Sequence, residues 1–332
     1  MSTRIVLKYQ SGSALREQTE ERKCPDGLRR ARSALRKPLR VGCVTGPQDD
    51  NPDLAAVARR AGLVRVGARP PFGEYLRQVF AHRDFAWSLG AAKAYNRNYN
   101  NYLGQLWAVL NPSLLALTYY IVFGLLLATR RGVDNYIAFL VIGIFMFTYV
   151  ADSLTAGATS VTGNVNLIRA LQFPRAVLPL SVALTELLIL LPGLAVMVVV
   201  VLVSGEPLRW TILAAPGVIV LALLFNAGAA MLAARMVAAA RDLRNLIPVA
   251  TRLLRYFSGV FYSIDTYAGD GILGLLLKYQ PFSVYIELMR ASLMAEVPMT
   301  LDMWIAGLAW ALVVASVGLT AFWRAEERYG RD

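Results

Sequence analysis

The sequence contains few of the residues from which metal centres and disulfide frameworks are built. Its 332 residues include two cysteines, Cys24 and Cys43, and one histidine, His82. A zinc site usually takes about four Cys or His ligands, and a disulfide framework needs several cysteine pairs. We therefore expect no metal site and no disulfide framework, and we interpret both cysteines as reduced thiols.

Charged residues are also scarce. They make up 17% of the sequence, whereas hydrophobic residues make up 56% and the mean hydropathy is +0.47. Soluble domains contain about 25% charged and roughly 45–50% apolar residues. Because this chain is richer in apolar residues than a water-exposed surface allows, most of it is expected to lie in a lipid bilayer.

Two kinds of enzymatic machinery are missing. The sequence has no G-x-x-x-x-G-K-[ST] phosphate loop, so we expect this chain to bind no ATP and no other cofactor. A membrane glycosyltransferase or phosphatase would need carboxylates or a histidine nucleophile gathered at one interface. The acidic residues after position 71 are scattered and His82 is isolated. These absences argue against an enzyme.

Residues 1–71 form a basic extension. Residues 1–70 hold 15 of the 34 Lys and Arg residues but 7 of the 22 Asp and Glu residues, and Gly, Pro, Asp and Asn clusters interrupt them. We interpret the extension as mostly disordered. The basic run at 29–40 could bind nucleic acid or anionic lipid, but no nucleic-acid fold accompanies it. We therefore expect no nucleic-acid partner, and no apolar run in the first 30 residues suggests a signal peptide.

From residue 72 to residue 105, apolar residues recur at helical spacing with basic residues beside them. This pattern is typical of amphipathic helices in the cytoplasmic interface. Apolar segments able to cross a core of about 30 Å at 1.5 Å per residue follow. The sequence thus predicts an all-α integral membrane protein with a six-span domain at residues 106–332. The predicted spans cover 107–128, 136–158, 179–203, 210–234, 246–264 and 301–323.

The placement of Lys and Arg predicts the orientation of the spans. An even number of spans puts both termini on one side of the membrane. With the termini inside, the inner segments after residue 71 carry 12 Lys and Arg residues and the outer segments carry 5. Because cytoplasmic loops are enriched in positive charge, we predict a multi-pass protein of the plasma membrane with both termini in the cytoplasm.

The segment between predicted spans five and six, residues 265–300, is too broken to cross the membrane and too apolar for a free loop. Residues 271–279 and 282–294 have the character of two short helices joined at Gln280 and Pro281. Helices that do not cross are tolerated at membrane depth where they pack against protein or line a cavity. We predict two re-entrant helices on the outer face.

Three charged residues lie inside predicted spans, namely Glu186 in the third and Arg252 and Arg255 in the fifth. Each costs roughly 2.5–3.5 kcal/mol at the bilayer midplane, so each should face protein, a partner subunit or a watery path. Arg252 and Arg255 are three residues apart and share a helix face, where their guanidinium groups could bind a phosphate-bearing substrate. Two alternatives stay open: an interhelical pair with Glu186, or an arginine that extends to the membrane surface.

Aromatic residues recur on the first, second and fifth predicted spans. Faces of sugar rings pack on aromatic rings, so a glycan channel could use such a set, although aromatic residues in spans more often serve packing or interface belts. The set includes Phe145, Phe147, Phe261 and Tyr262. The hypothesis of a substrate path takes five others together with the two arginines: Tyr119, Tyr120, Phe123, Tyr149, Tyr256, Arg252 and Arg255.

Several short motifs occur in the order found in one family of membrane proteins. Residues 103–112 read LGQLWAVLNP and precede the first span, and NLIR at 166–169 and FPR at 173–175 lie between spans two and three. RDL at 241–243 and QPF at 280–282 follow. Together, over residues 72–332, they resemble ABC-2 type permeases, in particular those that export lipid-linked polysaccharides such as O-antigen, teichoic acid and galactan. The sequence FWRAEERYG at 322–330 resembles the actinobacterial branch.

The resemblance implies a subunit of an ATP-driven exporter with no catalytic residue of its own. In such exporters two permease copies form a channel, and two copies of a separate ATPase, which binds ATP and Mg, lie below it. This chain would move a polysaccharide carried on a polyprenyl diphosphate from the cytoplasmic to the outer face. The polysaccharide would be a cell-wall galactan or a teichoic-acid-like glycan.

The resemblance also implies roles for particular segments. Residues 72–104 would be the interface helix, 269–295 the outer gate helices, and 162–178 the segment that couples to the ATPase. Similar permeases carry an acidic residue where Glu186 stands. Positive-inside placement explains part of the presence of the two arginines in the coupling segment. The residues implied to contact the ATPase are Asn166, Arg169, Phe173, Pro174 and Arg175.

Two features depart from the family pattern. The family often has Arg-Tyr a few residues before the LG pair, whereas Asn98 separates Arg97 from Tyr99 here. The first 70 residues match nothing in the family core, and we expect them to be dispensable for transport. Two other functions stay open: an ABC-2 permease for a small lipid or drug, and a membrane scaffold or channel with no energy input.

Overall fold

A computed structural model describes residues 70–97, 102–126, 133–207, 209–264 and 271–326. The chain divides into two units, 1–63 and 64–332, and all the described residues belong to the second. The predicted basic extension, apart from its last two positions, lies outside the described residues, as do both cysteines. So do residues 98–101, 127–128, 265–270 and 327–330, which belong to the predicted interface, span, outer and C-terminal segments.

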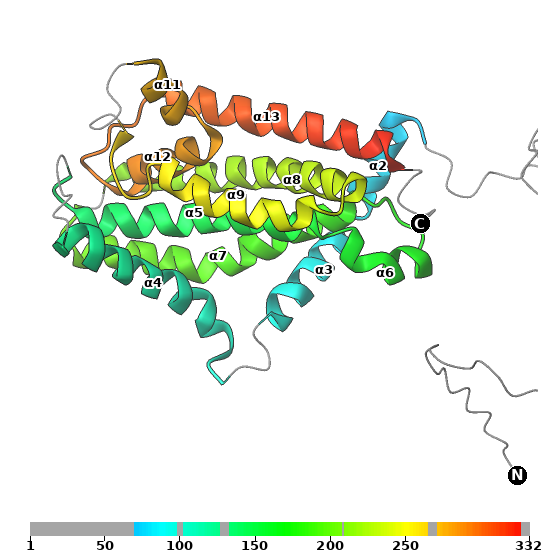
Figure 1. Cartoon of the computed structure of the whole chain (residues 1–332), viewed down its shortest axis with the longest axis horizontal. Helices are drawn as coiled ribbons and strands as arrows, with labels where there is room; N and C mark the ends of the chain where they lie inside the picture. The colour runs from blue at the N-terminus through cyan, green and yellow to red at the C-terminus, as the bar shows by residue number, and fades with distance from the viewer. Residues whose placement is uncertain (1–69, 98–101, 127–132, 208, 265–270, 327–332) are drawn as a thin grey trace, which may run out of the picture. The chain divides into compact units, whose positions relative to one another are not determined.

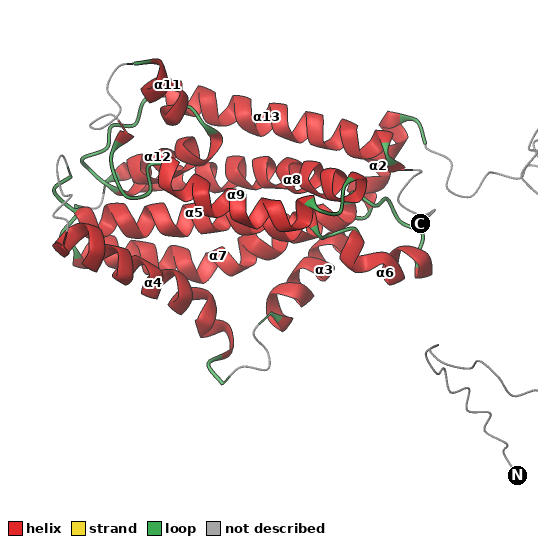
Figure 2. Ribbon diagram, in the orientation of Figure 1, coloured by secondary structure: helices red, strands yellow, loops and turns green. Residues whose placement is uncertain are grey.

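The described residues form helices and their connections, with no strand among them (Figure 2), which confirms the predicted all-α class. Five helical segments are long and apolar enough to cross a membrane. They overlap predicted spans one, two, three, four and six. In chain order they are α4 (Trp107–Tyr119) continued by η3 (Tyr120–Leu126), α5 (Tyr136–Ala158), α7 (Val177–Val203), η5 (Trp210–Ala214) continued by α8 (Ala215–Ala239), and α13 (Leu301–Arg324).

Shorter helices lie at both ends of this bundle. Figure 1 shows α11 and α12 at one end, called here the α11 end, and α2 and α6 at the opposite end, called the α2 end. The segments predicted as interface, coupling and re-entrant elements each contain helix, although residues 171–176 of the coupling segment are not helical. The shorter helices are α2 (Phe72–Ala81), α3 (Arg83–Asn96), η2 (Gly104–Leu106), η4 (Thr162–Asn164), α6 (Val165–Ala170), α9 (Leu243–Phe257), α11 (Ile272–Lys278) and α12 (Pro281–Leu293).

Helix α5 is the centre of the bundle. It packs against α4, α7, α8, α9 and α12, and its residues 138–147 are all buried. A helix that is apolar on every side is stable only when its whole circumference is covered by apolar neighbours. The long hydrophobic run of α5 meets that condition because other helices surround it (Figure 1).

Helices α8 and α13 meet through glycine. A Cβ atom at Gly228 of α8 would lie 2.5 Å from the carbonyl oxygen of Val314, and one at Gly318 of α13 would lie 2.5 Å from the carbonyl oxygen of Gly228. Small residues let helix backbones approach closely, which matters in lipid, where apolar side chains gain little from leaving their solvent. Alanine at either position would force the two helices apart.

The structure differs from the prediction at the fifth span, 246–264. Helix α9 begins at Leu243 and ends at Phe257, so its 15 residues rise only about 22 Å at 1.5 Å per residue. The next residues form an irregular turn in which Gly259 has a φ of +68°, a left-handed conformation that ends a helix readily only at glycine. Because α9 is short and carries several arginines, it is not among the five candidate spans.

Helix α9 nevertheless runs along α5 from the α2 end toward the α11 end (Figure 1). Arg252 lines the same cavity as Asp152, Arg255 lies over the ring of Phe147, and the Val260 backbone lies close to Gly143. The helix and the irregular turn together therefore follow α5 from its last turns to its first half.

The two helices at the start of the described chain are fixed to different spans. The ring of Phe72 in α2 meets the ring of Trp323 in α13 edge to face at 5.4 Å, and the Trp323 indole donates to the carbonyl of Pro70 at 2.9 Å. In α3, the carbonyl of Gly90 accepts from the hydroxyl of Thr185 of α7 at 3.1 Å. The predicted interface segment is thus packed against protein on one side.

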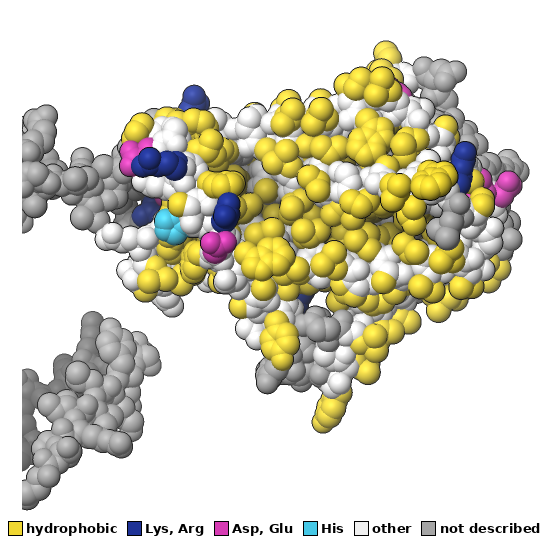
Figure 3. All heavy atoms as spheres, turned by 180° about the vertical axis from the view of Figure 1, so that it is seen from behind, with side chains coloured by type: hydrophobic (Ala, Val, Ile, Leu, Met, Phe, Trp, Pro, Cys, Tyr) yellow, Lys and Arg dark blue, Asp and Glu magenta, His cyan; other side chains and the backbone are white. Residues whose placement is uncertain are grey.

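The surface of the bundle is apolar between two charged ends. Figure 3 shows hydrophobic side chains over the middle of one face, with Lys, Arg, Asp, Glu and His82 gathered toward the ends. A band of this kind is what a membrane-spanning bundle presents to lipid, since charged side chains are costly in hydrocarbon.

Candidate functional site

A polar cavity of about 490 Å³ lies between α5 and α9. Three arginines line it, Arg97 at the end of α3 and Arg244 and Arg252 on α9, against one acidic residue, Asp152 of α5. Two threonines, Asn245 and a few apolar residues complete the wall. The cavity therefore brings together cations from two segments that are far apart in the sequence.

Arg97 forms ion pairs with two carboxylates. Its Nη1 lies 2.8 and 2.7 Å from the two carboxylate oxygens of Glu186 on α7, and its Nη2 lies 3.4 Å from Asp152. The Glu186 side chain is only 5% exposed. Charge-assisted hydrogen bonds of this geometry are among the stronger polar contacts in proteins. One guanidinium thus contacts both acidic groups beside the cavity, and its single positive charge offsets one of their two negative charges.

Arg244 and Arg252 have no acidic partner within 4.0 Å in the part of the chain that the structure describes. Both side chains are exposed to the cavity or to its surroundings. The three arginines of the cavity face two carboxylates, those of Asp152 and Glu186, so the cavity has one positive charge in excess. A concave site lined by one sign of charge raises the local concentration of opposite charge. The arrangement suits an anionic group such as a phosphate or diphosphate.

The structure separates the two arginines of the predicted pair. Arg252 lines the cavity, whereas Arg255 lies one turn further along α9 with its guanidinium 5.1 Å from the centre of the Phe147 ring. Arg255 is also close enough to Asp152 for their charges to attract. The partner of Glu186 is Arg97, so neither arginine of α9 forms the interhelical pair with Glu186 that the sequence left open.

Aromatic residues form a cluster along the same helix, nearer the α11 end. The ring of Phe261, in the turn after α9, lies 4.5 Å from Tyr119, 5.0 Å from Phe123 and 5.5 Å from Tyr256. This set, Tyr119, Phe123, Tyr256 and Phe261, is called the aromatic cluster below. It joins α4 and η3 to α9. Three of its members belong to the predicted substrate path.

The two other aromatic residues of the predicted path lie elsewhere. The ring of Tyr120 faces Tyr136 of α5 at 6.5 Å. Tyr149 is 3% exposed and its hydroxyl lies near Asn226 of α8. Tyr149 is therefore enclosed between helices of the bundle, and it neither lines the cavity nor belongs to the aromatic cluster.

The predicted coupling segment divides into an exposed and a packed part. Asn166 and Arg169 are exposed on α6. Phe173 instead packs on Phe85 of α3, with ring centres 5.2 Å apart, and Pro174 is buried. Only the first part therefore presents side chains outward from the α2 end.

Arg175 is tied to the end of α13. Its backbone N–H donates to Glu326 Oε1 at 3.0 Å and its guanidinium donates to the carbonyl of Glu326. Glu326 Oε2 also accepts from the hydroxyl of Tyr75 on α2 at 2.9 Å. Burial raises the pKa of the Glu326 carboxyl above its ordinary value, although these donors oppose the shift. Three distant segments meet at this one carboxylate.

Arg290 is the polar residue that the sequence reasoning missed. It is one of the five positive charges that the sequence assigns to the outer segments. In the structure it is completely buried in α12, and its guanidinium contacts backbone carbonyls of α5 and of the turn after α9. One sequence signal was present, since an arginine follows Glu287 by three residues within an otherwise apolar helix. Within the described ranges, no group of three His, Cys, Asp or Glu residues is placed to hold a metal ion.

The amino-acid sequence matches a known family of membrane proteins. The model of the ABC-2 type transporter family matches residues 87–294, more than half of the chain. The chain is 26% identical over 206 residues to the O-antigen export system permease protein RfbA of Myxococcus xanthus, covering 62% of this chain and 78% of that protein. It is 32% identical over 165 residues to the protein of the same name from Klebsiella pneumoniae, covering 49% of this chain and 62% of that protein.

Proposed function

The chain belongs to the ABC-2 type transporter family, and from that premise we propose that it is the membrane permease of an exporter of lipid-linked polysaccharide. It is a multi-pass membrane protein and the transport component, not a catalytic one. ATP and Mg are assigned to a separate ATPase subunit. The names of the relatives, which are O-antigen export permeases, support a polysaccharide cargo.

The observation that carries the proposal is that Arg244 and Arg252 line the cavity with no acidic partner within 4.0 Å among the described residues, which leaves the cavity with an excess of positive charge. A polysaccharide built on a polyprenyl carrier has a diphosphate between lipid and sugar, and guanidinium groups bind phosphate oxygens with two parallel hydrogen bonds. The cavity has room for such a group at about 490 Å³. We assign it as the place where the headgroup binds.

The aromatic cluster continues the path. It lies further along α9 than Arg252 and Arg255, toward the α11 end, so a glycan that follows its headgroup would meet aromatic faces next. The tyrosine hydroxyls and the flat rings suit sugars, which have polar edges and apolar faces. The groups along α9 are thus ordered with the arginines first and the aromatic rings second, which matches a diphosphate followed by a glycan.

The partners proposed are a second copy of this chain and two copies of the ATPase. The exposed residues Asn166 and Arg169 on α6 are the side chains offered to the ATPase, and Phe173, Pro174 and Arg175 transmit its movement through their packing on α3 and α13. The α2 end is then cytoplasmic, in agreement with the excess of Lys and Arg on the predicted inner segments. The location is the plasma membrane. Both termini are placed inside because α2, near the start of the described chain, packs against the last residues of α13 at the α2 end.

The cargo proposed is a cell-wall glycan of the galactan or teichoic-acid type, because the C-terminal segment 322–330 resembles the actinobacterial permeases of this kind. A small lipid or drug is the alternative cargo. It draws support from an apolar groove of about 590 Å³ between the beginnings of α8 and α13, which includes Val220, Trp304 and Ile305. An acyl chain would fit the lining of that groove without any polar contact.

The test is ATP hydrolysis by the permease in nanodiscs after co-expression with a candidate ATPase subunit. We expect the two proteins to purify together and a polyprenyl-diphosphate-linked glycan to stimulate hydrolysis. Stimulation by small amphiphiles but not by the glycolipid would favour the alternative cargo. A permease that purifies without any ATPase would leave only the scaffold or channel.

A further inference from the structure

Arg290 lies on α12 with none of its surface exposed, and every one of its guanidinium nitrogens has a backbone partner. Nε and Nη2 donate to the carbonyl of Phe139 on α5 at 3.3 and 3.1 Å. Nη1 donates to the carbonyl of Gly259 at 2.9 Å, and Nη2 donates to that of Val260 at 3.0 Å. One side chain therefore joins α12, α5 and the turn that follows α9.

The turn needs such a partner. The last carbonyls of a helix have no N–H donor within the helix. An irregular segment buried at membrane depth must likewise find donors for its carbonyls. Val260 and Phe261 are both buried. The planar fork of arginine can reach several carbonyls at once, which a lysine cannot do.

The neighbouring residues make room for this contact. A Cβ atom at Gly143 of α5 would lie 2.6 Å from Nη2 of Arg290 and 3.2 Å from the carbonyl oxygen of Val260. Only glycine at this position lets the guanidinium and the turn lie against α5. Glu287, one turn before Arg290, supplies the counter-charge at 2.8 Å. Without this partner the buried guanidinium would be an uncompensated charge, which is costly in free energy.

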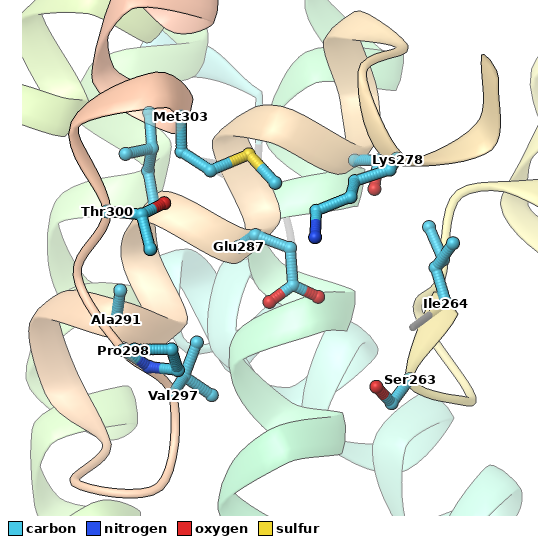
Figure 4. Close-up of a pocket in the computed structure, with 11 residues that line it drawn as sticks. Ser263, Ile264, Lys278, Glu287, Ala291, Val297, Pro298, Thr300 and Met303 are labelled. Atoms are coloured by element: carbon cyan, nitrogen blue, oxygen red, sulfur yellow. The ribbon is translucent and has the colours of Figure 1, made fainter. Parts of the chain in front are cut away.

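The Glu287 carboxylate also faces a small cavity of about 80 Å³ at the α11 end. Figure 4 shows Glu287 pointing into this cavity from α12 and Lys278 pointing toward it from α11. The cavity adjoins the turn after α9 as well, since Ser263 and Ile264 line it. The cavity thus adjoins both short helices of the α11 end and that turn.

We propose that Arg290 is a positioning residue that latches α12 to the turn after α9 and thereby fixes Phe261 in the aromatic cluster. Phe261 follows Val260 directly, so a carbonyl held at Val260 also sets where the Phe261 ring lies. The ring has its three aromatic neighbours only in that position. The consequence for transport rests on the proposed export function, whereas the latch itself does not.

The test measures how accessible Val260 becomes when the latch is broken. Cys24 and Cys43 are replaced by serine, and Val260→Cys is introduced as the reporter, since the Val260 side chain is fully buried. The purified complex with its ATPase is treated with a water-soluble maleimide. We expect slow labelling with Arg290 present and at least tenfold faster labelling in Arg290→Met, which keeps the bulk of the side chain but none of its donors.

Two further variants separate a latch from a general loss of folding. Arg290→Lys keeps the positive charge beside Glu287 but loses the planar guanidinium fork, so labelling should be as fast as in Arg290→Met. Gly143→Ala leaves Arg290 in place but pushes its guanidinium away, so labelling should also rise. Gly73→Ala is the matched control, because a Cβ there meets nothing within 4 Å. Ala222→Cys on α8, also fully buried, is the control reporter and should stay unlabelled in every variant.

Slow labelling of Val260→Cys in both Arg290→Lys and Gly143→Ala would overturn the latch, and so would Ala222→Cys labelling that rises in parallel with it. Substrate-stimulated ATP hydrolysis is measured on the same samples. If labelling rises as expected but no glycolipid stimulates the unsubstituted complex, the latch stands and the proposed cargo fails. If the glycolipid stimulates the complex and labelling does not change, the proposed function stands and the latch fails.

Discussion

Nη1 of Arg97 lies within 2.8 Å of both carboxylate oxygens of Glu186, although 89 residues separate the two in the chain. The contact joins the end of the interface helix α3 to the middle of the apolar helix α7. Both oxygens of the Glu186 carboxylate accept from Arg97, so this carboxylate does not pair with the other arginines of the neighbouring cavity. The positive character of that cavity therefore depends on a pair at its edge as well as on the arginines that line it.

Breaking this pair should destabilise the protein. Arg97→Met leaves the Glu186 carboxylate buried with no partner, and loss of a hydrogen bond to a charged group costs about 1.5–3 kcal/mol. We expect a lower midpoint of thermal unfolding in detergent. The double variant Arg97→Met with Glu186→Gln removes both charges and should recover most of the loss. A double variant as unstable as the sum of the two single ones would contradict a direct pair.

Arg252 should affect substrate affinity more than stability. Its guanidinium faces the cavity without an acidic partner among the described residues, so Arg252→Ala breaks no internal ion pair there. One charge-assisted contact to a phosphate is worth about 1.5–3 kcal/mol, or roughly a 10- to 150-fold change in affinity. We expect the glycolipid concentration for half-maximal ATPase stimulation to rise within that range.

The matched control for Arg252 is Arg241→Ala, an exposed arginine just before α9 that does not line the cavity. It removes one positive charge from the same region. The control should bind the glycolipid as the unsubstituted protein does. Equal weakening by both substitutions would indicate general attraction to the membrane surface and not a defined headgroup site.

The coupling segment should respond differently at its two parts. Arg169 is exposed on α6, so Arg169→Glu is expected to reduce co-purification with the ATPase and to leave the unfolding temperature unchanged. Arg175 donates inward to Glu326, so Arg175→Met should lower the unfolding temperature instead. Both quantities are measured on each variant. A stable Arg175→Met that loses the ATPase would show that Arg175 contacts the partner directly.

The Glu326 carboxylate should make stability depend on pH. Burial raises its pKa in the fold, so the folded protein binds this proton more tightly than the unfolded chain. The stabilisation is then fully present below the ordinary carboxyl pKa and is lost as the pH rises through the folded value. Tyr75 and Arg175 face the group and limit the shift.

The variant Glu326→Gln isolates this effect, because glutamine resembles the protonated acid at every pH. The variant should unfold at a higher temperature than the unsubstituted protein at neutral pH, and the difference should shrink as the pH falls. At each pH the unfolding temperature of one protein is subtracted from that of the other, so that the contributions of the other carboxyl groups cancel. A difference that grows toward acid pH would have the wrong sign.

The spans could be predicted because their signal is local. A run of more than 20 apolar residues is visible in the sequence without any knowledge of its neighbours, and α5 begins and ends at the predicted residues. The end of α9 could not be predicted in the same way. Gly259 ends the helix through a left-handed turn, and its carbonyl is held by a residue 31 positions away.

The charged contacts show the same division. Glu186 stands out in the sequence because a carboxylate is costly in lipid. Its partner Arg97 does not, because helical periodicity relates residues three or four apart and not 89. The sequence predicts Arg290 only as a positive charge of the outer segments, for a related reason: its partners are backbone carbonyls, which no residue type reveals. Such pairings follow from the tertiary packing of α12 on α5.

The aromatic cluster should act through the faces of its rings. Tyr256 is half exposed beside Phe261, so it is the member best placed to meet a passing glycan. Tyr256→Phe keeps the ring and should retain export, whereas Tyr256→Ala should slow it roughly 2- to 10-fold, because a ring contact is worth about 0.5–1.5 kcal/mol. The measurement is the amount of glycan reaching the outer surface of cells with equal amounts of permease. Equal losses in both variants would assign the effect to the hydroxyl and not to the ring, and no loss in either would remove Tyr256 from the path.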